Sequence, residues 1–261
     1  MEFCSIASGS SGNCIYVGTN ETSLLVDAGV SCKRIADGLK SIDVNVAELD
    51  GIFITHEHID HIQGVPILAR KYGIDIFGTH DTLKYIYNKE KGNLGESRLI
   101  DIAADTDVCI GDVLVHPFSI SHDAADPVSY RIESDGKIFA IATDLGCYDD
   151  YIVKNMMNAD GVYLEANHDY NMLMVGSYPY SLKQRVAGSK GHLSNDAAAE
   201  LLLRIGSERL KAVLLAHLSK ENNYAELAYE TVRAELLGKW EYGPIEMTVA
   251  PRDIPSALYT I

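Results

Sequence analysis

The sequence predicts an α/β protein in which sheets are covered by helices. Short apolar runs rich in Ile and Val alternate along the chain with segments of helical periodicity. The chain has 261 residues, enough to bury one large core. Because no repeat, low-complexity tract or linker interrupts it, we expect a single domain that spans residues 1–261.

Five apolar runs predict buried strands, and each leads into a polar residue at its C-terminal end. The runs are residues 24–26, 51–54, 138–142, 162–164 and 212–216. The polar residues that follow them are Asp27, His56, Asp144, Glu165 and His217. A sheet holds the ends of its strands rigidly, so these side chains are expected to form a fixed polar cluster at its edge.

Helices are predicted from periodicity and from residues that start or stop a helix. The predicted segments are 64–72, 195–205 and 225–237. Pro66 lies in a first turn and Gly73 follows a last turn, while Ser194 is a typical N-cap. The Gly- and Ser-containing stretches 8–12 and 173–191 are expected to be irregular loops.

Composition limits the classes of function. The net charge of −15 argues against a protein that coats nucleic acid with a broad basic face. A local cationic site can still hold phosphate, because charges are screened beyond about 8 Å at physiological salt. Five cysteines, an odd number with no CxxC pair, argue against a disulfide framework. With no signal peptide or membrane span expected, the sequence predicts a cytoplasmic protein that does not contact a membrane.

The segment 55–61, Thr-His-Glu-His-Ile-Asp-His, predicts a metal site. His56 and His58 are two positions apart, so their rings lie on the same side of an extended backbone. Asp60 and His61 follow within three residues and add a carboxylate and a third imidazole. This donor set suits Zn²⁺, Mn²⁺ or Fe²⁺. The alternative is a solvated polar loop.

Three further ligands are predicted from later segments. His122 is a candidate third imidazole for a first metal, and the alternative is a surface histidine. Asp144 follows an apolar strand and could bridge two metals, or simply cap that strand. His217 has the same setting and could complete the second metal.

The segment 56–61 resembles the HxHxDH signature of the metallo-β-lactamase superfamily. The resemblance implies an αββα sandwich of two facing mixed sheets with helices outside, and two divalent metal ions at the strand ends. Asp27 resembles the aspartate of this superfamily that does not bind the metal itself but supports the loop that carries the metal ligands. A plain turn residue is the alternative for Asp27.

A narrower resemblance extends over nearly the whole chain. Its motifs are 8–14, 121–124, 143–146, 165–169, 191–195 and 216–223, which resemble those of the YycJ/WalJ-type family. This resemblance implies a 5′-to-3′ exonuclease that acts on the 5′ end of duplex DNA in DNA repair. It also implies a functional link to a two-component system of the cell wall.

The ligand set predicts a metal-dependent hydrolase, and the segment 191–195 together with the Lys/Arg stretch at 183–190 favours a phosphodiester as the substrate. Metals lower the pKa of bound water from about 15.7 toward 7, so a bridging hydroxide is available to attack phosphorus. Asp60 would orient this nucleophile or accept its proton. Resemblance to ribonuclease Z implies that Glu165 and His192 assist departure of the leaving group. A locally satisfied structural role is the alternative for both residues.

Substrate contacts are predicted between residues 168 and 190. Lys183, Arg185 and Lys190 lie in a stretch with Tyr178 and Tyr180, which suits a nucleic-acid backbone and an end base. A solvated surface loop is the alternative. His168 is a further candidate substrate contact, weighed equally against a structural role.

Three other functions are compatible with the metal motif. A tRNA 3′-processing-type endoribonuclease and a small-molecule ester or thiolester hydrolase share the HxHxDH loop. A non-catalytic partner in cell-wall regulation with a structural metal is less favoured, because structural sites are usually closed and four-coordinate. Nucleotide release from duplex DNA distinguishes the nuclease from all three.

Overall fold

The computed structural model describes residues 1–261, which divide into two compact units. The first unit contains residues 1–119, 124–136 and 251–260, and the second contains residues 120–123 and 137–250 with Ile261. The expected single domain over residues 1–261 stays a prediction. No helix is both long enough and apolar enough to cross a membrane.

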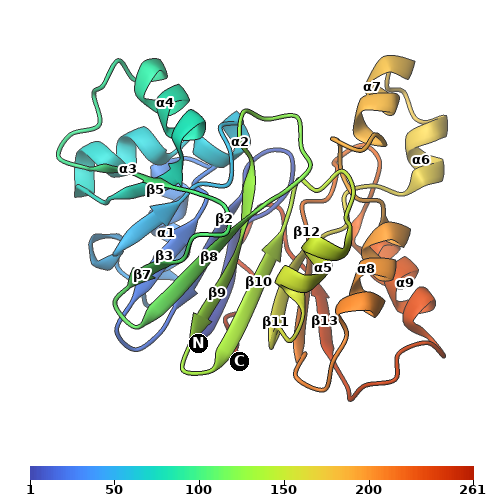
Figure 1. The fold of residues 1–261 in the computed structure, drawn as a ribbon. Coiled ribbons are helices and arrows are strands. Elements are labelled where there is room, and N and C mark those ends of the chain that lie inside the picture. The colour runs from blue at the N-terminus through green and yellow to red at the C-terminus, as the bar shows by residue number, and fades with distance from the viewer. The chain divides into compact units, whose positions relative to one another are not determined.

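The first unit holds a seven-stranded mixed sheet with the order β14-β1-β2-β3-β4-β5-β6 (Figure 1). Its strands are β1 (Glu2–Ala7), β2 (Cys14–Gly18), β3 (Ser23–Val26), β4 (Gly51–Phe53), β5 (Ile76–Thr79), β6 (Leu99–Ile102) and β14 (Tyr259–Thr260). Pairing is antiparallel from β14 through β3 and parallel from β3 to β6. The C-terminal ends of β3 and β4 therefore lie side by side, with Val26 opposite Phe53.

The helices of the first unit lie between its parallel strands in sequence. They are α1 (Cys32–Lys40), α2 (Ile59–Ile62), α3 (Val65–Tyr72) and α4 (His80–Lys89), with a 3₁₀ turn at Val46–Glu48. In α3 the N-cap is Gly64, Pro66 is in the first turn and Gly73 ends the helix in the left-handed conformation.

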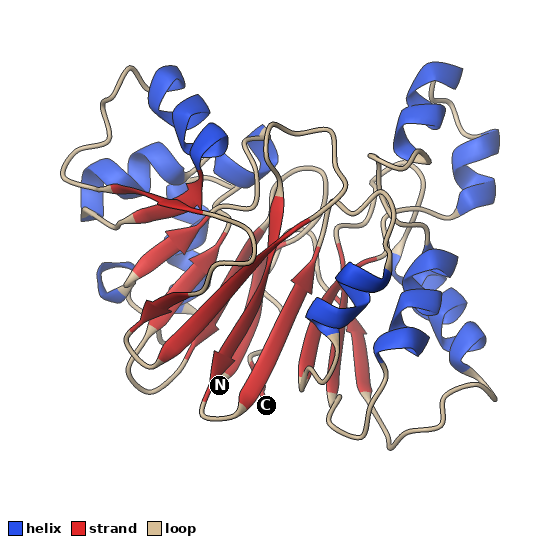
Figure 2. Ribbon diagram, viewed as in Figure 1, coloured by secondary structure: helices blue, strands red, loops and turns tan.

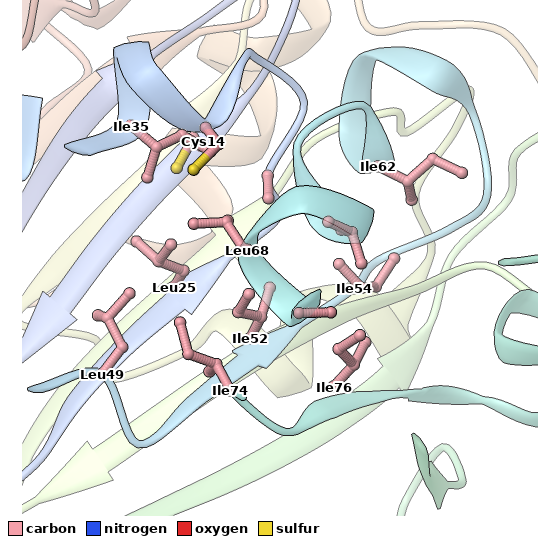
Figure 3. Close-up of a cluster of buried hydrophobic side chains, with 14 of the residues drawn as sticks. Cys14, Leu25, Ile35, Leu49, Ile52, Ile54, Ile62, Leu68, Ile74 and Ile76 are labelled. Carbon is pink, nitrogen blue, oxygen red and sulfur yellow. The ribbon is translucent and has the colours of Figure 1, made fainter. Parts of the chain in front are cut away.

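The core of the first unit packs these helices onto the sheet (Figure 3). Leu25 and Ile52 project from β3 and β4, and they share one cluster with Ile35 of α1 and Leu68 of α3. All four side chains are fully buried. Burying such a side chain stabilises the fold by about 1.5–3 kcal/mol, so this cluster fixes the strands next to residues 55–61.

The other seven strands form two ladders, one in each unit. The first unit holds the antiparallel ladder of β7 (Val108–Ile110), β8 (Val113–Ser119) and β9 (Val128–Ser134). The second unit holds the parallel ladder of β10 (Lys137–Ala142), β11 (Gly161–Glu165), β12 (Ala212–Ala216) and β13 (Glu246–Val249). Because β10, β11 and β12 are parallel, the residues that follow them emerge at the same edge.

Helices connect the parallel strands of the second unit (Figure 2). They are α5 (Asp150–Met156), α6 (Tyr170–Val175), α7 (Tyr180–Val186), α8 (Asn195–Ile205) and α9 (Ala225–Leu236). The side chain of Ser194 caps α8 by accepting a hydrogen bond from the Ala197 amide, and α8 packs against α5 and α9.

The five predicted strands and three predicted helices are confirmed. The prediction of an irregular loop over 173–191 is wrong for residues 173–175, which belong to α6, and for residues 180–186, which form α7. Asp169 caps α6 through the Met172 amide, and Pro179 directly precedes α7. α6 buries Leu173 alone and α7 buries no residue, so neither helix has the repeated buried positions from which periodicity predicts a helix.

Candidate metal centre

The segment after β4 brings together four potential ligands within the first unit. His56 and His61 are buried, and His58 is the N-cap residue of α2. The ring centroid of His56 lies 4.6 Å from that of His58 and 4.1 Å from that of His61. Asp60 Oδ2 lies 3.6 Å from His61 Nε2. The turn from β4 into α2 thus clusters three imidazoles and one carboxylate.

Asp27 supports this cluster from the end of β3. Its carboxylate accepts hydrogen bonds from the amide and the hydroxyl of Thr55, and Oδ2 lies 2.7 Å from His61 Nδ1. Asp27 has φ +61°, a backbone region that residues other than glycine adopt rarely. The contact places the imidazole proton of His61 on Nδ1, which leaves Nε2 as the atom for a metal.

The loop 8–13 holds the same cluster through Asn13, which the sequence reasoning did not assign. The Asn13 amide N–H donates to the Asp60 carbonyl at 2.8 Å, and Asn13 Nδ2 lies 3.1 Å from His61 Nε2. Gly29 packs tightly here, because a Cβ at this position would lie 1.6 Å from the Asp60 carbonyl oxygen. An asparagine that ends a Gly- and Ser-rich stretch was the available signal in the sequence.

The second unit is organised around Glu165, which ends β11 and has an exposed fraction of 0%. Its Oε1 lies 2.8 Å from Nδ1 of His192 and 2.8 Å from Nδ1 of His217. Its Oε2 accepts hydrogen bonds from the amides of Leu145 and Leu193. Both oxygens of this carboxylate therefore orient other groups.

The charges around Glu165 follow from these contacts. Burial raises the pKa of the Glu165 carboxyl, but His192 and His217 outweigh burial and hold its pKa at about 2. Burial lowers the pKa of His192, whereas Glu165 and Asp144 raise it more, so the pKa of His192 lies above its ordinary value. Glu165 is accordingly an anion that favours a proton on Nδ1 of both histidines.

Asp144, His217 and His122 lie close to one another in the second unit. Asp144 Oδ1 is 3.6 Å from His217 Nδ1 and 3.7 Å from His122 Nε2. Asp144 follows β10 with φ +57°, and His217 follows β12 with φ +56°. Such a backbone conformation costs on the order of 1–3 kcal/mol and persists where the surroundings require it. His122 Nδ1 lies 3.2 Å from the Gly191 carbonyl, which favours its Nε2 for a metal.

The donor set of each unit fits divalent metal ions. In the second unit, Asp144, Glu165, His192 and His217 offer ligand atoms that all lie within 4.8 Å of one another. Because Glu165 is hydrogen bonded at both oxygens, Asp144 and His217 are the better ligands in this group. Imidazole and carboxylate donors, with Nδ1 held by Asp27 or Glu165, are the arrangement that metal-binding histidines require.

The proposed substrate contacts lie in different environments. Lys183 Nζ donates to the Met174 carbonyl at 2.6 Å, and Arg185 Nε lies 2.5 Å from Asp123 Oδ2, whereas Lys190 is exposed. His168 has an exposed fraction of 1%, and burial lowers its pKa to about 4 although Glu165 acts in the opposite direction. These four residues stay predictions as substrate contacts.

Comparisons with known proteins identify the family. The model of the β-lactamase superfamily domain matches residues 22–218. The chain belongs to the metallo-β-lactamase superfamily. Within it, exodeoxyribonuclease WalJ of Streptococcus pneumoniae serotype 2 is 43% identical over 90% of this chain and 88% of its own length. Exodeoxyribonuclease YycJ of Bacillus anthracis is 37% identical over 89% of this chain and 88% of its own length.

The chain therefore belongs to the WalJ/YycJ family and is a metal-dependent hydrolase. A crystal structure of the metallo-β-lactamase-fold protein YhfI from Bacillus subtilis has a TM-score of 0.73 and covers 98% of both chains. Its identity to this chain is 18%, so this likeness concerns the fold alone. The predicted fold class, the metallo-β-lactamase sandwich, is confirmed.

Proposed function

We propose that this chain is an exodeoxyribonuclease that removes nucleotides from the 5′ end of duplex DNA. The single observation that carries the proposal is the identity of 43% over 90% of the chain to a protein named as an exodeoxyribonuclease. The proposal is also supported by two carboxylates, Asp27 and Glu165, which contact Nδ1 of His61 and His217. Such contacts orient histidines that bind a metal through Nε2.

We propose that two divalent ions, Zn²⁺ or Mn²⁺ with Fe²⁺ as the alternative, are the cofactors. The proposed ligands are His56, His58, Asp60, His61, His122, Asp144 and His217. When bound, the metals supply water of lowered pKa and positive charge for the phosphoryl oxygens. In three of these histidines Nδ1 faces an acceptor: a carboxylate for His61 and His217, and the Gly191 carbonyl for His122.

Three residues have proposed roles beyond ligation. Asp60, with a partly exposed side chain, orients the attacking water and accepts its proton. His192 gives a proton to the leaving oxygen, which is consistent with its raised pKa and its exposed fraction of 22%. Glu165 is fully buried with both oxygens hydrogen bonded, so we assign it the positioning of His192 and His217.

The segment 170–190 is proposed to contact the DNA. It contains Lys183, Arg185 and Lys190 and no Asp or Glu, although the chain has a net charge of −15. Tyr180 has an exposed fraction of 72% in α7, which suits stacking against an unpaired base. The paired cations Lys183 and Arg185 contribute to the local potential, and Lys190 is the candidate for direct phosphate contact.

A digestion assay tests the proposal. Duplex DNA with a 5′-phosphate, labelled at either end, is incubated with the purified protein and Mn²⁺, Zn²⁺ or Mg²⁺. We expect mononucleotides to be released from the 5′ end, and no release by His61→Ala. Absence of release with every metal contradicts the nuclease function. Internal cleavage of structured RNA would favour the tRNA-processing alternative, and hydrolysis of thiolesters alone would favour a small-molecule hydrolase.

We also propose that this activity serves DNA repair in the cytoplasm, with a functional link to a cell-wall two-component system. Support for both comes from membership of the WalJ/YycJ family. Deletion of the gene should raise the mutation rate if the repair role holds.

A further inference from the structure

Asn13 and His61 form a contact that bears on how the metal centre is loaded. The two side chains are buried, and Asn13 Nδ2 lies 3.1 Å from His61 Nε2. The orientation of the Asn13 amide is fixed, because its Oδ1 accepts a hydrogen bond from the Gly9 amide at 2.9 Å. The NH₂ group therefore faces His61 as a donor.

The acceptor in this contact is the lone pair that a metal needs. His61 Nδ1 lies 2.7 Å from Asp27 Oδ2, so Nδ1 carries the proton and Nε2 is unprotonated. A divalent metal binds imidazole nitrogen at about 2.0–2.1 Å along the same lone pair. One lone pair accepts either the Asn13 N–H or the metal.

We propose that Asn13 is a latch that competes with the metal at His61 and sets the affinity of that metal position. The inference rests on the proposed metal-dependent function and concerns a positioning residue outside the predicted ligand set. Loading His61 displaces the Asn13 amide. Asn13 therefore lowers the affinity of the metal position that includes His61.

Loop 8–12 is coupled to the latch. The Asn13 backbone is held by the Asp60 carbonyl at 2.8 Å and by Gly29, whose amide donates to the Asn13 carbonyl at 2.7 Å. The side chain must therefore move while the backbone stays. This movement breaks the contact with the Gly9 amide, and the positive φ values of Gly9 and Gly12 let the loop adjust.

The test is a titration of the metal-free protein with Zn²⁺ against a fluorescent chelator, without any substrate. The wild type should bind two ions, and His61→Ala should lose one of them. Asn13→Ala should tighten that ion roughly five- to tenfold and leave the other unchanged, because one buried hydrogen bond no longer competes. Ser11→Ala, an exposed change in the same loop, is the matched control and should bind Zn²⁺ like the wild type.

A second measurement on the wild type does not depend on how the variant folds. In NMR spectra, the Asn13 side-chain amide and the Gly9 backbone amide should shift at the step that His61→Ala removes. Unchanged or weaker Zn²⁺ binding by folded Asn13→Ala overturns the latch, as do Asn13 and Gly9 signals that stay fixed during that step. A wild type that binds no Zn²⁺ overturns the proposed function as well, so the two failures are distinguishable.

Discussion

The two units support their histidines in different ways. In the first unit, four potential ligands come from one six-residue segment, and Asp27 supports a single histidine, His61. In the second unit, residues far apart in sequence converge on Glu165, whose Oε1 serves both His192 and His217. In the first unit, one carboxylate therefore holds one proposed metal ligand. In the second unit, one carboxylate holds both a proposed metal ligand, His217, and the proposed proton donor, His192.

The largest expected effect comes from Glu165→Gln, because it weakens the support of two histidines together. We expect kcat/KM for duplex DNA to fall roughly 10³-fold, if each histidine loses 10–100-fold. The measurement is nucleotide release under saturating Mn²⁺, with circular dichroism to confirm the fold. A loss no greater than that of Asp27→Asn would remove the contrast between the units.

His192→Ala separates the two functions of the Glu165 cluster. We expect kcat to fall about 10²-fold, within the 10²–10⁴-fold range of general acid catalysis, with little change in DNA affinity. Zn²⁺ content should stay at the wild-type level, because His192 is outside the proposed ligand set. Equal losses in kcat and in DNA binding would make His192 a substrate-binding residue.

Asp27→Asn tests the local support of the first unit. The change keeps the shape but removes the charge that holds the proton on His61 Nδ1. We expect metal affinity to fall about 10–100-fold at one position only, with the other unchanged. Isothermal titration with Zn²⁺ measures this, and equal weakening of both ions would show that Asp27 acts beyond His61.

The smallest effect is expected in the segment 170–190. Lys190→Ala should weaken DNA binding a few-fold and reduce the slope of log K against log salt by about 0.9. Arg185→Ala should have a smaller effect on that slope, because Arg185 is already paired with Asp123. Fluorescence anisotropy at several salt concentrations distinguishes the two, and identical slopes would contradict this assignment.

The sequence predicted the features that depend on local pattern. The strand that ends at Glu165 and the strands that end shortly before Asp27, His56, Asp144 and His217 were visible because buried parallel strands are continuous apolar runs. The helix after Ser194 was visible through its cap. Features that depend on tertiary contacts were not visible.

The short helices α6 and α7 were not visible either, because α6 buries Leu173 alone and α7 buries no residue. The contact of Asn13 with His61 joins residues 48 positions apart, and a spacing pattern carries no information on it. The sharing of Glu165 between His192 and His217 likewise depends on how β11 and β12 pair.

The most direct test of the account is a crystal structure of the protein loaded with Zn²⁺ or Mn²⁺, with the ions located by anomalous scattering. We predict ions bonded at about 2.0–2.2 Å to Nε2 of His61 and to Nε2 of His217, while Nδ1 of each ring stays on Asp27 and Glu165. Rings bonded through Nδ1, or no ion beside either histidine in metal-loaded crystals, would contradict it.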